Sequence, residues 1–116
     1  MEVANKVLTQ EQTQELLEFL LKSNNLEFNA LKVVEEALET SELLTKLVTK
    51  VERLKPTKEQ LIEELGDLMM RTTVFCLHLG ISEAVELRSE NKFAALYDWM
   101  KEGNLGSTVT VTKRSK

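Results

Sequence analysis

Apolar residues along this chain recur every three or four positions in four segments, at about 9–22, 29–54, 57–79 and 82–101. A period near 3.6 residues is typical of α-helices that bury one face. Only one proline and four glycines interrupt the chain, whereas a strand-and-turn architecture would need such residues far more often. The pattern therefore predicts an all-α, bundle-like domain of four helices over residues 1–103.

Helix-end signals mark the first and third segments. Thr9 with Gln12, and Thr57 with Gln60, each place a hydroxyl and an amide three residues apart, which is the pattern of a capping box at a helix start. Gly80 follows the third segment, where a glycine can adopt the left-handed conformation that closes a helix. These signals predict a first helix running to about residue 22 and a third running to about residue 79.

The second segment has two apolar stripes. We expect its helix to begin near Asn29, a good N-cap residue, and to end near Arg53 or Leu54, before Pro56. One stripe comprises Val33, Ala37, Leu44, Leu47, Val51 and Leu54, and the other comprises Leu31, Val34 and Leu38. A helix that is apolar on two faces in so small a protein predicts association between subunits, as a homodimer or homotetramer.

The pattern changes after Gly103. Threonine and valine alternate over residues 108–112, which favours an extended strand. A lone strand needs a partner, and a basic run follows it at 113–116. We predict that residues 104–116 form either a strand that pairs with another subunit or a mobile tail, and we favour the tail.

A seven-residue pattern of apolar and acidic positions occurs twice, in 33–39 and in 61–67. Each copy reads apolar, apolar, Glu, Glu, apolar, any residue, acid. Acids three positions apart lie about 60° apart around a helix, so each copy presents two carboxylates on one flank. Packing of the two helices through their apolar stripes would bring four acids together: Glu36, Glu39, Glu64 and Asp67.

Four carboxylates in one site need a counter-charge, because like charges at short range raise one another's pKa or push the helices apart. Oxygen ligands alone suit a hard cation, Mg²⁺ or Mn²⁺, rather than zinc. Glutamate pairs at helical spacing more often form a solvated surface. The repetition of the pattern at the edge of an apolar stripe favours a metal site here.

Composition narrows the chemistry further. The net charge of −4 predicts no nucleic-acid partner, and a nucleotide would need a cation to approach the acids. Cys76 and His78 are the only residues of their kinds, which excludes an internal disulfide, a zinc site and a histidine-based nucleophile. We interpret Cys76 as a buried inert thiol and His78 as an ordinary histidine at a helix edge. The sequence shows no secretory signal and no bilayer-length apolar run, so we expect a cytoplasmic protein without membrane contact.

The acidic pattern resembles the metal signature of the MazG-like all-α nucleoside triphosphate pyrophosphatase superfamily, which also includes dimeric dUTPases and phosphoribosyl-ATP pyrophosphatases. The likeness covers residues 28–95. It consists of Glu35-Glu36-x-x-Glu39, a spacer of 24 residues and Glu64-x-x-Asp67, with Gly66 in a matching context. The resemblance implies that Mg²⁺, with Mn²⁺ as an alternative, supports hydrolysis of a nucleoside triphosphate to the monophosphate and pyrophosphate.

The resemblance also implies substrate contacts on the fourth helix. Asn91 and Lys92 match the stretch with which the family reaches the substrate phosphates. The arginine that often follows in the family is absent, since Ala95 and Leu96 occupy its positions. A cation for the phosphates could then come from elsewhere in the protein.

Two further side chains near the acids have candidate roles. An attacking water needs an acceptor, and Glu35 is a candidate general base, although a surface or supporting role is open to it. Arg71, one turn beyond Asp67, would either pair with an acid or meet a phosphate, and we favour the salt bridge.

Two other functions stay open at this point. The protein could be a member of the same superfamily that is selective for dUTP or dCTP, with base discrimination in pocket residues that spacing does not identify. It could also be a non-catalytic helical interaction module, whose acids are solvated and whose two-faced second helix binds a partner.

Overall fold

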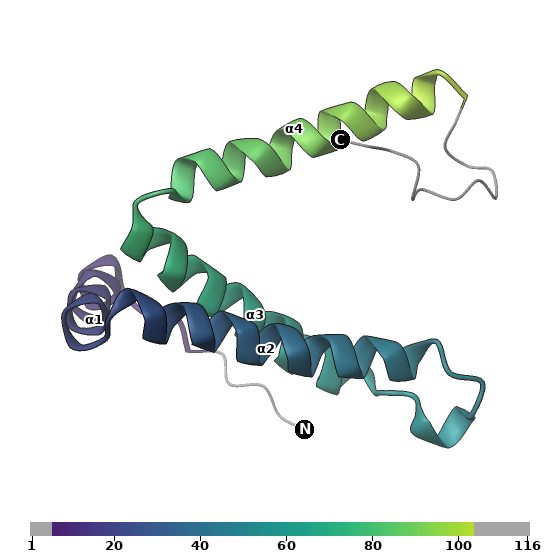
Figure 1. The fold of residues 1–116 in the computed structure, drawn as a ribbon, viewed down its shortest axis with the longest axis horizontal. Helices are drawn as coiled ribbons and strands as arrows, with labels where there is room; N and C mark the ends of the chain where they lie inside the picture. Colours follow the sequence, from purple (N-terminus) through teal and green to yellow (C-terminus); the bar gives the residue numbers. More distant parts are fainter. Residues whose placement is uncertain (1–5, 104–116) are drawn as a thin grey trace. The chain divides into compact units, whose positions relative to one another are not determined.

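The computed structural model of the protein describes residues 6–103, which form helices and no strand. In chain order the elements are α1 (Gln10–Ser23), α2 (Leu26–Leu47), the 3₁₀ helix η1 (Glu52–Leu54), α3 (Lys58–Leu79) and α4 (Ser82–Lys101) (Figure 1). The all-α prediction is confirmed for this part of the chain. The predicted strand or tail, residues 104–116, lies outside the described residues.

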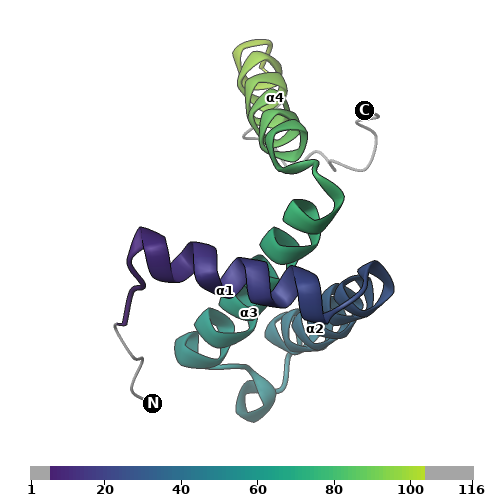
Figure 2. The same cartoon turned by 90° about the vertical axis from the view of Figure 1, so that its left-hand side faces the viewer.

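The chain divides into two compact units, one ending at Gly80 and the other beginning at Ile81. In the first unit α2 and α3 pack side by side, and α1 runs across their direction and contacts α3 (Figure 2). The second unit contains α4, whose first residue follows Ile81 without a side-chain cap. Packing of α4 on the other helices, as a four-helix bundle requires, stays a prediction.

Both predicted capping boxes are confirmed. At the start of α1, the Thr9 hydroxyl accepts from the Gln12 N–H at 3.1 Å, and the Gln12 amide oxygen accepts from the Thr9 N–H at 3.0 Å. Thr57 and Gln60 make the same pair of bonds at the start of α3, at 3.1 and 2.9 Å. Each box satisfies two backbone donors that the first helical turn leaves unpaired.

The predicted start of the second helix at Asn29 is wrong. Helix α2 begins at Leu26, and its cap is Asn25, whose side-chain oxygen accepts from the Phe28 N–H at 2.7 Å. Asn29 lies inside the first turns of the helix and is 1% exposed. Both asparagines are good caps by composition, and Asn29 is instead turned into the helix interface, as described below.

The predicted end of the second helix near Arg53 or Leu54 is also wrong. Helix α2 ends at Leu47, and η1 forms separately before Pro56. The intervening residues include the β-branched Val48, Thr49 and Val51, which lose side-chain freedom in a helix. The Thr49 hydroxyl accepts from the Val51 N–H at 3.4 Å, so the side chain competes with the helical pattern of backbone bonds.

Few apolar side chains are buried in residues 6–103. Val74 and Cys76 of α3 and Trp99 of α4 are the buried apolar residues of this part of the chain. Cys76 is a free buried thiol, as predicted. On the second stripe of α2, Leu31 and Leu38 are 65% and 66% exposed. Association between subunits would cover such a stripe, and it stays a prediction.

The helices of residues 6–103 include none that is both long and apolar enough to span a membrane.

Gly66 inside α3 and Gly80 at its C-terminal cap give opposite expectations for an alanine substitution. A Cβ at Gly66 would have no atom within 4 Å, so Gly66→Ala should raise the free energy of unfolding by about 1 kcal/mol, because alanine is the better helix former. Gly80 has φ 74°, so Gly80→Ala should lower it by about 1 kcal/mol. Urea unfolding followed by circular dichroism measures both. A loss of stability in Gly66→Ala would show that another surface packs closely against this glycine.

Candidate metal centre

Two side-chain hydrogen bonds join α2 to α3. The Asn29 amide nitrogen lies 2.7 Å from His78 Nδ1, and because an amide NH₂ is a donor, the ring nitrogen accepts. The Thr40 hydroxyl donates to the backbone carbonyl of Glu64 over a longer 3.4 Å. From Asn29 to Thr40 the chain advances along α2, whereas their partners go back along α3 from His78 to Glu64. The two helices are therefore antiparallel (Figure 1).

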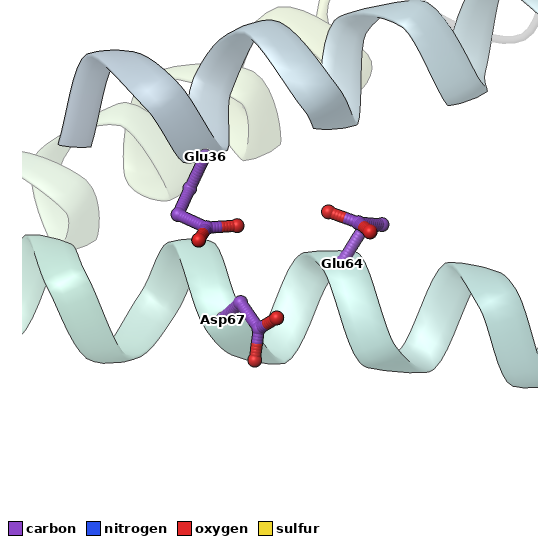
Figure 3. Close-up of side chains that lie close together, drawn as sticks. All are labelled: Glu36, Glu64 and Asp67. Carbon is purple, nitrogen blue, oxygen red and sulfur yellow. The ribbon is translucent and has the colours of Figure 1, made fainter. Parts of the chain in front are cut away.

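Three of the predicted metal ligands lie close together on the α2–α3 pair. Glu36 comes from α2, and Glu64 and Asp67 come from α3 one turn apart. One carboxylate oxygen of each lies within 4.8 Å of one from each of the others. Figure 3 shows Glu36 extending from α2 toward α3 and Glu64 extending from α3 toward α2. The acids of the two repeats thus converge across the helix pair, as their spacing predicts.

Glu39, the fourth predicted ligand, lies beside this triad. It does not belong to the group whose oxygens are all within 4.8 Å of one another. Its carboxyl group is nevertheless near enough to raise the pKa of both Glu36 and Glu64. Glu39 is therefore close enough to join the ligand set if its side chain turns.

The burial of the acids is uneven. Glu36 and Glu64 are half-buried, whereas Asp67 and Glu39 are exposed. One oxygen of Glu36 and one of Glu64, Oε1 in each, are shielded from solvent and have no hydrogen-bond partner. A shielded carboxylate oxygen without a partner has lost water and gained nothing in return, which is costly for a charged group.

Burial raises the pKa of the Glu36 and Glu64 carboxyl groups above the ordinary value of 4.5. Repulsion from Glu39 adds to the pKa increase at both groups, and Asp67 contributes further. All the causes favour the protonated form. Without a counter-charge, the folded protein therefore holds protons on these groups more tightly than the unfolded chain does.

These residues fit a hard divalent cation. The donor set consists of carboxylate oxygens only, and two of those oxygens are shielded and unpaired. Acidic clusters on exposed helix faces are common without a cation, but their oxygens point into water. Glu36, Glu64 and Asp67, with Glu39 beside them, could hold Mg²⁺ or Mn²⁺ and satisfy the unpaired oxygens.

Glu35 and Arg71 lie near the triad without joining it. Glu35 is exposed and pairs with Lys32 one turn earlier on α2, at 3.0 Å. Its charge makes a minor contribution to the raised pKa of Glu36. Arg71 is half-buried, and in the part of the chain that the structure describes no carboxylate lies within 4.0 Å of it, so the favoured salt bridge is absent.

The predicted substrate-binding residues belong to the other unit. Asn91 and Lys92 are exposed on α4. Their approach to the acids stays a prediction, because α4 and the acid-bearing helices are in separate units.

Sequence reasoning missed the two side chains that make the tightest cross-helix bond. The sequence alone predicts Asn29 as a helix cap and His78 as an ordinary histidine at a helix edge. A usable signal was that His78 falls on the same flank of α3 as Glu64 and Arg71, which is the flank that faces α2. The partner of His78 could not be read from spacing, since it lies 49 residues away.

The raised pKa values predict how stability depends on pH in the presence of a chelator. Stability should fall as the pH rises from 4.5 through the raised pKa values, because in that window the folded state binds more protons than the unfolded chain. Glu36→Gln or Glu64→Gln removes this penalty. Each should raise the Tm at about pH 7, where acids are ionised, and the gain should disappear below pH 4.5.

Thermal unfolding in a pH series measures this effect, and Glu63→Gln is the matched control, since Glu63 is an exposed neighbour of Glu64. An equal gain in Glu63→Gln would mean that the effect comes from net charge and not from the cluster.

The chain matches no protein-family model, no curated protein and no solved structure. The resemblance to the MazG-like superfamily therefore stays a prediction from the sequence, which rests on the acidic pattern of residues 35–67.

Proposed function

We propose that this protein is a Mg²⁺-dependent nucleoside triphosphate pyrophosphohydrolase, which releases the nucleoside monophosphate and pyrophosphate. The observation that supports it most is the meeting of Glu36 with Glu64 and Asp67 across two helices, with shielded oxygens that have no partner. The same three residues are metal-ligand positions of the motif that the sequence shares with the MazG-like superfamily. If these acids formed only a solvated surface, there would be no reason for the residues of the motif to lie close together.

Each acid has a distinct task in this proposal. Glu36 and Glu64 present buried oxygens from opposite helices, and Asp67 and Glu39 supply exposed carboxylates at the open side. A bound Mg²⁺ would neutralise the phosphate oxygens and the charge that develops on the departing pyrophosphate. With the cation bound, a polyanionic substrate could approach this acidic surface.

Water attacks the α-phosphorus in the proposed reaction, and the bond from that phosphorus to the bridging oxygen of the β-phosphate breaks. Glu35, which precedes Glu36 on α2 and pairs with Lys32 at 3.0 Å, would accept the proton of the water. Arg71, without a carboxylate partner in residues 6–103, is a candidate to meet a substrate phosphate. Asn91 and Lys92 of α4 stay candidates for phosphate contacts from the sequence resemblance alone.

A second candidate function is a non-catalytic interaction module. The exposed Leu31, Val34 and Leu38 of α2 favour it, because large apolar side chains in a row on one helix mark a contact surface. The same stripe would serve subunit association in the enzyme. Turnover, rather than self-association, therefore separates the two functions.

Removal of one ligand should abolish metal-dependent turnover. Pyrophosphate release from a panel of canonical and modified nucleoside triphosphates should require Mg²⁺, and Glu36→Gln or Asp67→Asn should lower kcat/KM about 100-fold or more. The loss follows because the remaining carboxylates would bind the cation, and with it the substrate phosphates, more weakly. Circular dichroism checks that the variants remain helical.

Glu63→Gln is again the matched control, with the same chemical change one residue from Glu64 and outside the cluster. Parent-like turnover in Glu36→Gln and Asp67→Asn would refute the site. Absence of turnover in the parent protein, with no rise of its Tm on addition of Mg²⁺, would favour the interaction module.

The proposed base can be tested separately from its ion pair. Glu35→Gln should lower kcat about 100-fold or more without changing the Mg²⁺ dependence, because the carboxylate that accepts the proton is lost. Lys32→Gln breaks the same ion pair and keeps the carboxylate, so it should retain most of kcat. Equal losses in the two variants would assign Glu35 a structural role only.

A further inference from the structure

The Asn29–His78 bond is the most protected polar contact between the helices. Asn29 is the one residue of the described chain whose side chain is fully buried, and its amide reaches His78 at 2.7 Å. The bond joins the start of α2 to the end of α3. A directional bond at this place constrains how far one helix can slide along the other, which apolar contacts alone do not do.

The acids lie between this bond and the contact of Thr40 with Glu64. Thr40 is 11 positions after Asn29 along α2, which is about 16 Å of helix, and Glu36 lies between them. A slip of α2 by one turn would move it by about 5.4 Å relative to α3. That displacement exceeds the 4.8 Å within which the carboxylate oxygens of the triad are grouped. The combination of Glu36 with Glu64 and Asp67 therefore exists in only one register of the two helices, because a slip of one turn would move Glu36 away from the other two acids.

Other forces on the helix pair select this register less strongly than the Asn29–His78 bond does. The acids repel one another across the interface, which favours separation. Buried apolar side chains are few in the described part of the first unit, namely Val74 and Cys76. The Thr40 contact, at 3.4 Å, is long for a hydroxyl donor.

We propose that Asn29 and His78 are positioning residues, whose buried hydrogen bond holds α2 and α3 in the register that brings Glu36 to Glu64 and Asp67. This inference rests on the proposed function only as far as cation binding is concerned. The register itself is a property of the helix pair.

Two substitutions at one position provide the contrast. His78→Leu removes the acceptor, whereas His78→Asn places an amide oxygen where Nδ1 now accepts from Asn29. His78 is half-buried, so both changes leave the fold intact. The double variant Asn29→Leu/His78→Leu exchanges the buried polar pair for an apolar one, which restores stability without restoring a directional bond.

The first readout needs no metal. In the parent protein, protons of the Thr40 side chain should show a nuclear Overhauser contact to protons of α3 at Glu64, because the Thr40 hydroxyl lies 3.4 Å from the Glu64 carbonyl oxygen. We expect this contact to persist in His78→Asn and to be lost in His78→Leu and in the double variant. The second readout is Mn²⁺ affinity by calorimetry, which should weaken about 10-fold or more in the two variants that lose the contact.

Val74→Ala is the control for simple destabilisation, because it opens a cavity in α3 and leaves both bonding partners in place. It should lower the Tm and keep both the Overhauser contact and the Mn²⁺ affinity. Retention of both in the double variant would overturn the inference, as would a His78→Asn variant that behaves like His78→Leu. If the parent protein binds no Mn²⁺, the proposed function fails, and the Overhauser contact still decides the role of the pair.

Discussion

Repulsion between carboxylates across α2 and α3 is the constraint on which the rest of this protein depends. Two helices that each present acids on the packing flank would separate or take up protons unless something compensates. Burial already shifts Glu36 and Glu64 toward their protonated forms, and one oxygen of each is shielded without a partner. The arrangement is costly for the folded state by itself, and a divalent cation, if bound as proposed, would offset that cost.

This cost explains why the interface contains directional polar contacts as well as apolar ones. An interface held by apolar packing alone could relieve the repulsion by sliding, since such packing has many acceptable registers. The Asn29–His78 bond and the longer Thr40–Glu64 contact oppose sliding from either side of the acids. In the proposed role, these polar contacts restrict sliding of α2 along α3 and so keep the acids together.

The first unit also exposes apolar surface that its own packing does not bury. With Val74 and Cys76 as its buried apolar side chains among the described residues, the unit has little packing energy of its own. The exposed stripe with Leu31 and Leu38 is a reserve of apolar area that association could bury. Cation binding and subunit association would both add stability that this unit lacks, because each favours the folded form by mass action.

The sequence by itself determined the helices and the spacing of the acids. Capping boxes at Thr9 and Thr57 and the glycine at position 80 act within one turn of chain, so local chemistry was enough to place those ends correctly. The repeat that placed Glu36 and Glu64 on packing flanks is likewise a local property, because helix periodicity fixes which residues share a face. Local rules failed where two answers were equally good, as with Asn25 and Asn29.

Only the tertiary structure decided that Asn29 is buried in the helix interface and that it is the partner of His78. Either asparagine satisfies a cap, and the choice followed from which of them could bury its amide against a residue 49 positions away. The tertiary structure also decided the register that brings Glu36 within reach of Asp67 and leaves Glu39 at the side. Periodicity specifies the face of a helix but not its axial position, because sliding one helix along another leaves every residue on its own face.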